Sequence, residues 1–365
     1  MVPKQSLGAQ NPATFPVFFN PAARLNRDVS VAIARATRPS TFLDSLAGIG
    51  ARGIRIANEA DRAVDVTLVE FNRQSARIAE RNAGKNRVMK RCHVVHEESN
   101  AYLHSRYGRL ERFEAVDVDP FGTPAPYVQG AISATADEGI VSLTATDTAT
   151  LCGVYPRVAL RRYGARLMKT EFAHEVAVRV LLGFCARAGG TIDIGIRPVA
   201  AHCNLHYARV YFRVMRGAAR SDDCLKNLGF VSSCPACHQN VAAPRETGSC
   251  PGCGKKAKAA GPLWIGDLVG EELVGKAVDC CVGSGWDEAR RELEDLRGCD
   301  SYPPFGYSLE NIASREGVSS VSFQAVAEAL ARRGSGAMRQ PFGSRGLKTT
   351  ADYSEVVEAV RECAR

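Results

Sequence analysis

The amino-acid sequence predicts an α/β protein whose core is a doubly wound, mostly parallel sheet. Three observations support this fold class: strand and helix patterns alternate over residues 41–144, a glycine-rich turn follows the first strand, and two further strand patterns close the sheet before residue 216. Such alternation is typical of parallel strands joined by crossover helices. The chain has 365 residues, 45% of them hydrophobic, and is long enough for two domains.

Each element of the sheet has its own pattern. Asn20-Pro21 interrupts the chain before a helix that we expect at residues 22–37. Short apolar or β-branched runs predict strands, and runs with helical periodicity predict helices. The expected strands are 41–44, 64–71, 92–96, 113–118 and 139–144, and the expected helices among them are 54–60 and 73–82.

The end of the sheet departs from this parallel pattern. After a helix expected at residues 171–188, the runs Thr191–Pro198 and His206–Met215 alternate in the way of strands. Only seven residues, Val199–Leu205, connect them, and so short a link favours an antiparallel pair. A mostly parallel sheet that ends in an antiparallel pair is the form of the class I methyltransferase fold.

Composition and cysteine spacing indicate a second domain. Residues 217–262 are rich in Gly, Pro, Ser and Cys, so we expect a methyltransferase domain at 1–216 and a smaller α+β domain at 217–365. Thirteen cysteines without a leader pattern indicate reduced thiols. Four of them form two C-x2-C pairs with the spacing of a closed, structural zinc site, which we place in a knuckle at residues 230–260. These candidate metal ligands are Cys234, Cys237, Cys250 and Cys253.

The charge pattern favours a polyanionic partner. The formal net charge is +8; eleven basic and three acidic residues lie between Gly153 and Arg216, and Arg332–Lys348 holds five basic residues and no acidic one. One such run is explained equally well by a solvated basic face, but two favour nucleic acid. Lys255, Lys256 and Lys258, directly after the knuckle, are candidates for phosphate contacts. Since no eighteen-residue apolar run occurs, we expect a cytoplasmic protein that does not contact membranes.

A glycine-rich turn with an acidic partner predicts a nucleoside-cofactor site. The turn begins at Asp44 and continues through Gly48 and Gly50 to Gly53, between a strand and a helix. Glycine lets the backbone turn tightly and approach a ligand closely. Glu70 ends the next strand, where a carboxylate accepts hydrogen bonds from ribose hydroxyls. NAD and S-adenosylmethionine both carry that ribose, so the turn alone does not separate them.

The end of the fourth strand separates the two cofactors. Asp119-Pro120-Phe121-Gly122 follows this strand, at the edge where open α/β sheets bind ligands. An exocyclic purine amine is a poor nucleophile because its lone pair is delocalised into the ring. Hydrogen-bond acceptors for its N–H groups restore electron density to the nitrogen lone pair. We expect Asp119 and the Pro120 carbonyl to be these acceptors and Phe121 to stack on the base. The alternative is a simple Asp-Pro turn after a strand.

Several motifs together resemble one known family over nearly the whole chain. They are Phe18-Phe19-Asn20-Pro21 with Leu25-Asn26-Arg27-Asp28, Leu43-Asp44-Ser45-Leu46-Ala47 with Gly50-Ala51-Arg52-Gly53, Asp119-Pro120-Phe121-Gly122, Thr144-Ala145-Thr146-Asp147, and His174-Glu175-Val176. With these motifs the sequence resembles the tRNA (guanine-26-N2)-dimethyltransferase family.

The resemblance implies an S-adenosylmethionine-dependent enzyme that places one or two methyl groups on N2 of guanine 26 in tRNA. It implies that Asp119 is catalytic, with Pro120 beside it, and that Phe121 stacks on guanine. The residues taken together as the cofactor site are Phe18, Arg27, Asp44, Gly48, Gly50, Arg52, Glu70, Glu98 and Ser99. The family usually has Asp where Glu70 stands and Asp-Ala-Asn where Glu98-Ser99-Asn100 stands, and an alignment of that turn on Asn100-Ala101 stays open.

The expected cofactors are therefore S-adenosylmethionine and a structural zinc ion. The expected partner is tRNA, with the domain at 217–365 as an RNA-binding domain, and we expect no obligate protein partner. Two alternatives stay open at this point. One is a methyltransferase for another nucleic-acid amine, in rRNA guanine or DNA adenine. The other is a non-catalytic RNA-binding protein on the same fold. An NAD oxidoreductase is a more distant third.

Overall fold

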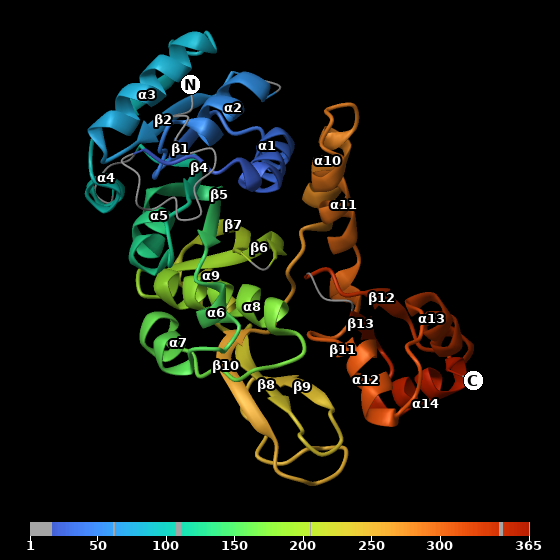
Figure 1. The fold of residues 1–365 in the computed structure, drawn as a ribbon. Helices are drawn as coiled ribbons and strands as arrows, with labels where there is room; N and C mark the ends of the chain where they lie inside the picture. The colour runs from blue at the N-terminus through green and yellow to red at the C-terminus, as the bar shows by residue number, and fades with distance from the viewer. Residues whose placement is uncertain (1–16, 61–62, 107–110, 205, 343–345, 365) are drawn as a thin grey trace.

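A seven-stranded sheet forms the centre of the molecule (Figure 1). The structure, a computed structural model, describes residues 17–60, 63–106, 111–204, 206–342 and 346–364. The strand order is β3-β2-β1-β4-β5-β7-β6, and β7 is antiparallel to both of its neighbours, whereas the other pairs are parallel. The strands are β1 Thr41–Asp44, β2 Asp65–Val69, β3 Cys92–Val95, β4 Phe113–Val118, β5 Thr135–Ala145, β6 Ile194–Cys203 and β7 Ala208–Arg216. The predicted fold class and the antiparallel closing pair are confirmed.

The closing pair is longer than the sequence predicts. The strand expected to end at Pro198 continues to Cys203, because the register shifts between Pro198 and Ala200 and the pairing with β7 then resumes. Such a bulge accommodates proline, which has no N–H for the ladder. The link between β6 and β7 is shorter than expected for the same reason; Leu205, within it, lies outside the described residues.

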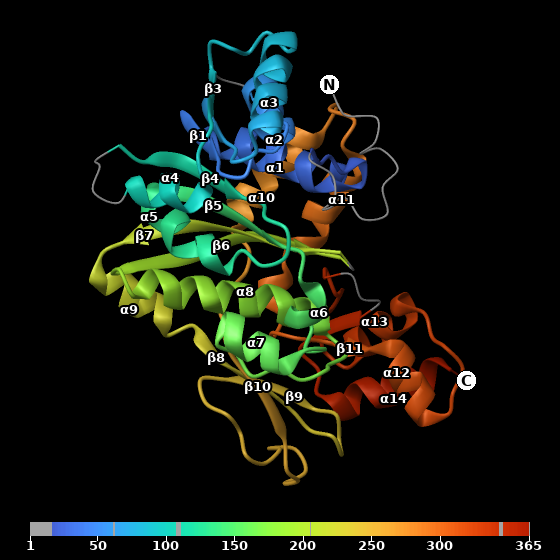
Figure 2. The same ribbon diagram turned by 60° about the vertical axis from the view of Figure 1, so that its left-hand side comes forward.

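Helices cover both faces of the sheet (Figures 1 and 2). The helix α8 is apolar on nearly all sides because the sheet, α5, α9 and β10 surround it. The helices up to the end of the sheet and just beyond it are α1 Arg24–Thr37, α2 Ala51–Glu59, α3 Arg73–Lys85, α4 Ser99–Ser105, α5 Val128–Ala134, α6 Thr148–Leu151, α7 Pro156–Tyr163, α8 Ala173–Gly190 and α9 Ala218–Leu225.

The chain after residue 216 has three parts. The strands β8 Leu228–Ser233, β9 Asn240–Ala243 and β10 Lys258–Trp264 form a sheet, called here the knuckle sheet, that packs on α8 through β10. The helices α10 Glu271–Cys281 and α11 Asp287–Leu296 pack back on α1.

The third part has an apolar core of its own. It consists of β11 Tyr307–Ser308, α12 Leu309–Glu316, α13 Phe323–Arg332, β12 Ala337–Arg339, β13 Gly346–Thr349 and α14 Tyr353–Cys363. The main core takes in residues on both sides of 216, and the domain boundary placed there stays a prediction. In the described ranges no helix is both long enough and apolar enough to span a membrane.

The two basic runs are only partly surface-exposed. Arg179, Arg209 and Lys348 are buried and pair with carboxylates of the interior. Arg332 and Arg333 both pair with Glu362. The expectation that both runs face a polyanion is therefore wrong for the buried Arg179, Arg209 and Lys348, because sequence charge alone does not reveal burial. Arg345, in the second run, lies outside the described residues.

Candidate functional site

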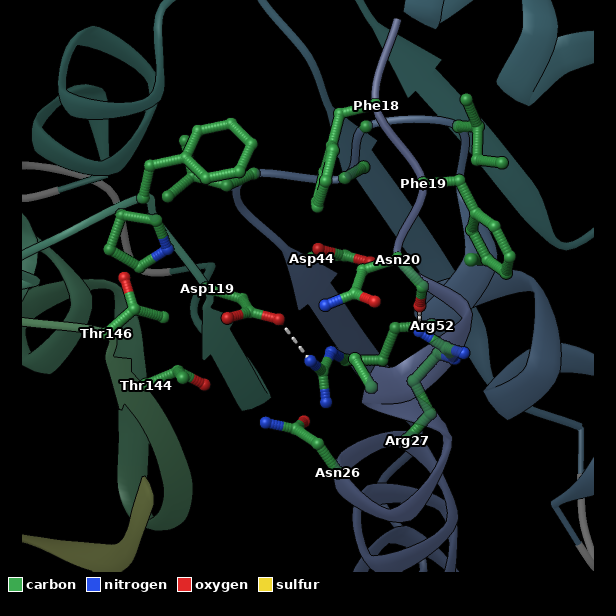
Figure 3. Close-up of a pocket in the computed structure, with 18 of the residues that line it drawn as sticks. Phe18, Phe19, Asn20, Asn26, Arg27, Asp44, Arg52, Asp119, Thr144 and Thr146 are labelled. Atoms are coloured by element: carbon green, nitrogen blue, oxygen red, sulfur yellow. Dashed lines mark hydrogen bonds and ion pairs between the residues drawn. The ribbon is translucent and has the colours of Figure 1, made fainter. Parts of the chain in front are cut away.

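A cavity of about 730 Å³ opens at the carboxyl ends of β1, β2, β4 and β5 (Figure 3). Open α/β sheets bind ligands at this edge, because the loops that follow the strands converge there. Most of the residues predicted for the site line this one cavity. They are Phe18, Arg27, Asp44, Gly48, Arg52, Glu70, Asp119, Pro120 and Phe121.

The glycine turn after β1 joins the cavity to the end of β2. The N–H of Gly48 donates to Glu70 Oε2 at 2.7 Å, and the N–H of Asn72 donates to Glu70 Oε1 at 2.6 Å. Burial raises the pKa of the Glu70 carboxyl above its ordinary value. The two amides fix the carboxylate at the rim of the cavity.

Gly50 does not line the cavity. It has φ of 76° directly before α2, and a Cβ at this position would approach Ile54 Cδ1 to 2.8 Å. The position therefore requires glycine because of the left-handed turn and the packing of α2 on the sheet.

An ion pair holds the carboxylate of Asp119 (Figure 3, dashed line). Arg52, in the first turn of α2, donates to Asp119 and to Ser30 and pairs through Nε with Asp117 Oδ1 at 3.2 Å. The Asp119 side chain is 32% exposed, whereas that of Arg52 is 6% exposed. Burial opposes ionisation of Asp119, but the guanidinium groups of Arg52 and Arg209 hold its pKa below the ordinary value. Asp119 is therefore a carboxylate at neutral pH.

A second arginine, on the sheet itself, pairs with the same Asp117 that contacts Arg52. Arg209 on β7 is fully buried, pairs with Asp117, and donates to Thr144 and to Tyr211 Oη, the latter at 2.8 Å. From the sequence, Arg209 was recognised only as one of the basic residues between Gly153 and Arg216. A signal was available: Asp117 lies on β4 and Asp119 follows its last residue, and two carboxylates two residues apart at a strand end need a cation beside them.

Asp44 lies beside these charges. Burial, together with the neighbouring carboxylate of Asp117, raises the pKa of Asp44 to about 7, although Arg52 opposes the shift. One of its oxygens accepts a hydrogen bond from the N–H of Gly53 at 3.1 Å. The cavity thus contains a carboxyl group that titrates near neutral pH.

Two aromatic rings stand at the mouth of the cavity. Phe18 and Phe121 meet edge to face with ring centroids 4.8 Å apart, and Phe121 is 62% exposed. The turn that carries Phe121 is held because the N–H of Gly122 donates to Thr146 Oγ1 at 2.7 Å and the N–H of Thr146 donates to the Gly122 carbonyl at 2.8 Å. An exposed ring held in place in this way offers a flat surface to a second ring.

Arg27 supplies a positive charge on the other side of the cavity. Its guanidinium lies over the ring of Phe19, and one nitrogen donates to the Asn20 carbonyl at 3.0 Å. Burial and the nearby charge of Arg52 lower the pKa of Arg27 to about 10. Among the described residues no carboxylate pairs with Arg27, so its charge is available to an anion. Asn26 Oδ1, also in the lining, is buried without a hydrogen-bond partner.

Glu98 and Ser99 lie outside the cavity lining. Glu98 precedes α4 and its side chain accepts from the N–H of Ala101 at 2.8 Å. Ser99 Oγ is buried and has no hydrogen-bond partner. Burial and the charge of Glu98 raise the pKa of Tyr127, which does line the cavity. The Glu98-Ser99 turn therefore stands near the cavity's edge.

Several lining residues were not selected from the sequence. Asn20, Asn26, Thr144 and Thr146 lie in the motifs that carry the resemblance, so a signal for them was present. Phe19 lies in one of these motifs too. Other lining residues had no signal of their own, among them Asn72 and Ser75 after β2, Tyr127 after β4, and His206 and Tyr207 before β7.

The four cysteines of the knuckle come together. Their Sγ atoms all lie within 4.8 Å of one another, with Cys234 and Cys253 at 3.5 Å and Cys237 and Cys250 at 3.4 Å. Zinc bound by four thiolates at 2.3 Å requires sulfur–sulfur distances of roughly 3.8 Å, so the arrangement fits that ion. Four thiolates leave no coordination position for water, and the site suits a structural zinc.

The sheet order, the antiparallel β7 and a ligand cavity with acidic residues after β2 and β4 define the class I methyltransferases, whose members use S-adenosylmethionine. The family model described as N2,N2-dimethylguanosine tRNA methyltransferase matches residues 3–361. The chain belongs to this family.

Individual relatives agree with the family model. The chain is 36% identical over 354 residues to the tRNA (guanine(26)-N(2))-dimethyltransferase of Methanopyrus kandleri, covering 96% of this chain and 91% of that one. Its identity to the enzyme of the same name from Methanothermobacter thermautotrophicus is 32% over 360 residues, or 95% and 93% of the two chains. The solved structure of Trm1 from Pyrococcus horikoshii with S-adenosyl-L-methionine matches with a TM-score of 0.85 and 29% identity over 98% of this chain and 96% of that chain.

Proposed function

We propose that this protein transfers methyl groups from S-adenosylmethionine to N2 of guanine 26 in tRNA, giving N2-methylguanosine and N2,N2-dimethylguanosine. The observation that carries the proposal is the ionised Asp119, held by Arg52 in the cavity beside the exposed ring of Phe121. The family and the names of the relatives supply the substrate. Because the substrate is tRNA, we place the protein in the cytoplasm.

The cavity fits S-adenosylmethionine, which supplies a methyl group on a positively charged sulfur. We propose that Glu70, which follows β2 and lines the cavity, accepts hydrogen bonds from ribose hydroxyls. The unpaired charge of Arg27 suits the carboxylate of the amino-acid portion, and the carboxyl of Asp44 suits its ammonium group. We assign Glu98 and Ser99 to the adenine end, where Ser99 Oγ lacks a partner.

Asp119 prepares the amine for transfer. Its carboxylate accepts a hydrogen bond from one N2–H, and the Pro120 carbonyl accepts one from the other, so the lone pair is concentrated on nitrogen. The N2–carbon bond forms as the sulfur–carbon bond breaks, the bonding pair stays on sulfur, and the proton passes to Asp119. Asp119 can accept this proton although its pKa is lowered, because the newly methylated aromatic amine is a cation and a strong acid until it loses the proton. Monomethylguanine retains one N–H, so a second transfer follows the same route.

The target guanine has to leave the tRNA stack to reach Asp119. Unstacking a base costs a few kcal/mol, and a stacking surface in the enzyme offsets part of that cost. Phe121 is the exposed ring closest to the carboxylate in sequence, and Phe18 braces it from the side. We propose that residues 217–365, with the knuckle sheet held by zinc, contribute to binding the rest of the tRNA.

Nucleoside mass spectrometry tests this function. Unmodified tRNA transcript with guanine at position 26, incubated with enzyme and S-adenosylmethionine, should yield N2-methylguanosine and then N2,N2-dimethylguanosine. A matched transcript with adenine at position 26 should yield neither. Methylation of the adenine-26 transcript, or transfer only to rRNA or DNA, would favour a methyltransferase for another nucleic-acid amine. Binding of both ligands without transfer would favour the non-catalytic alternative.

A further inference from the structure

A second cavity, of about 410 Å³, lies where three parts of the chain meet. The loop 168–172 before α8 forms one wall, the knuckle sheet with Ser233 and Lys258 forms another, and α12 with Asn311 and Arg315 forms the third. In Figures 1 and 2 the knuckle sheet lies below α8, and α12 lies to the right of the knuckle sheet. The two cavities share no lining residue.

The charge in this second cavity is mainly positive. Lys169 and Lys258 line it, and within the described part of the chain neither forms an ion pair. Arg315 pairs with Glu171, the only acidic residue among the described residues of the lining. The other carboxylate oxygen of Glu171 accepts a hydrogen bond from the N–H of Ser308 at 3.4 Å. Within the described residues, neither of these two ammonium groups therefore has a carboxylate partner.

Neutral hydrogen-bonding groups accompany these cations. Thr170 Oγ1 is buried and has no hydrogen-bond partner. Asn311 lies on the exposed side of α12 and contributes an amide to the lining. Lysines together with hydroxyl and amide groups are the side chains that contact phosphate and sugar oxygens in nucleic-acid complexes.

One segment of chain connects the two cavities. It begins at Thr146, which lines the first cavity, and continues through α6 and α7 to Lys169 in the second. Between them Arg157 and Arg161 are exposed on α7, and Tyr155 is 56% exposed just before it. Exposed arginines beside an exposed aromatic ring are typical of a surface that binds nucleic acid.

We infer that the second cavity binds a phosphate–ribose unit of the tRNA backbone while the target guanine occupies the first cavity. The inference rests on the proposed function. Phosphate contacts fix the register and orientation of a nucleic acid on a protein. A backbone contact at the junction of α8, the knuckle sheet and α12 fixes which nucleotide reaches Asp119.

Replacing both unpaired lysines tests the inference. For Lys169→Gln/Lys258→Gln in the zinc-loaded full chain, we expect the Kd for tRNA transcript to rise about tenfold and the slope of log Kd against log salt to fall by about two. The matched control is Lys85→Gln/Lys90→Gln, which removes two exposed lysines on and just after α3, at the other end of the molecule (Figure 1). S-adenosylmethionine affinity and zinc content should be those of the unmodified protein in both variants.

A second variant, on a different element, tests whether the effect of the lysine replacements comes from a local loss of structure. Asn311→Glu adds a carboxylate from α12, and tRNA affinity should fall by a similar factor while kcat at saturating tRNA is retained. A Kd and salt slope equal to those of the Lys85→Gln/Lys90→Gln control, for both variants, would overturn the inference. If the unmodified protein methylates guanine 26 while these variants bind tRNA normally, the proposed function stands and only the backbone site fails.

Discussion

At the scale of single residues, the site is a cluster of opposed charges. The carboxyls of Asp44, Asp117 and Asp119 share the guanidinium groups of Arg52 and Arg209. These groups do not titrate alike: Asp119 is held ionised, whereas the pKa of Asp44 is raised to about 7. The difference favours Asp119 over Asp44 for the proposed acceptor role and makes Asp44 sensitive to pH.

Binding of S-adenosylmethionine should therefore weaken as the pH falls. The ligand carries positive charge and prefers ionised Asp44, which is protonated as the pH falls through about 7. We expect Kd, measured by calorimetry, to rise roughly tenfold from pH 8 to pH 6. Asp44→Asn removes the titrating group, and its Kd should be weaker at pH 8 but nearly constant over this range. An equally steep pH dependence in Asp44→Asn would show that another group is responsible.

At the scale of elements, we expect the segment between β8 and β10 to depend on metal more than on apolar packing. The segment between β8 and β10 is largely exposed, and its four cysteines stand where thiolate ligands would fix two turns. By contrast, the first cavity is built from the loops of the main sheet and from the segment before α1. Loss of zinc should therefore leave the first cavity intact.

The variant Cys250→Ser tests this separation. Loss of one thiolate weakens zinc binding, so we expect zinc content by atomic emission to fall well below one ion per chain and amide exchange to accelerate in β8–β10. S-adenosylmethionine affinity should change less than tRNA affinity. Cys363→Ser, at the end of α14, is the control and should retain its zinc. Retention of a full zinc equivalent by Cys250→Ser would contradict the four-cysteine site.

The elements also show what sequence can and cannot predict. The parallel strands, the glycine turn, the Asp119 turn and the cysteine pairs carry local patterns, and all four were predicted. The extension of β6 beyond Pro198 was not, because tolerance of proline depends on a bulge paired with β7. The burial of Arg209 and Lys348 was missed for a similar reason, since their carboxylate partners lie far away in the chain. Arg179 pairs with Glu175 one turn away on α8, and its burial depends on the elements that pack around that helix.

At the scale of the whole molecule, one buried carboxylate ties the carboxyl-terminal part to the main body. Glu175 on α8 pairs with Arg179 on its own helix and with Lys348 Nζ of β13 at 3.2 Å, and it accepts from Gln340 Nε2 at 2.6 Å and the N–H of Phe305 at 3.1 Å. Burial opposes ionisation, yet Lys348 and Arg179 hold the pKa of Glu175 down, at about 2. The cluster bridges α8 and the last part of the chain.

Removing one cation from this cluster should destabilise the fold. Lys348→Met leaves the buried Glu175 carboxylate with one fewer charge partner, at a cost of about 3 kcal/mol in the free energy of unfolding measured in denaturant. The pKa of Glu175 in the folded protein lies below its ordinary value. Its contribution to the free energy of unfolding is therefore present above about pH 4.5 and is lost as the pH falls toward 2. Lys348→Met should make the free energy of unfolding less sensitive to acid. Glu175→Gln/Lys348→Met should recover part of the loss. A double variant no more stable than Lys348→Met would contradict this explanation.

The most direct test of the account is the variant Asp119→Ala, assayed in parallel for methyl transfer to guanine-26 tRNA and for S-adenosylmethionine affinity by calorimetry. The account predicts that kcat falls by roughly 10² to 10⁴ while Kd for the cofactor changes only slightly, since Glu70, Arg27 and Asp44 remain in place. Turnover close to that of the unmodified protein would contradict the role of Asp119 as the acceptor for N2. Loss of cofactor binding along with turnover would show that Asp119 maintains the cavity instead of activating the amine.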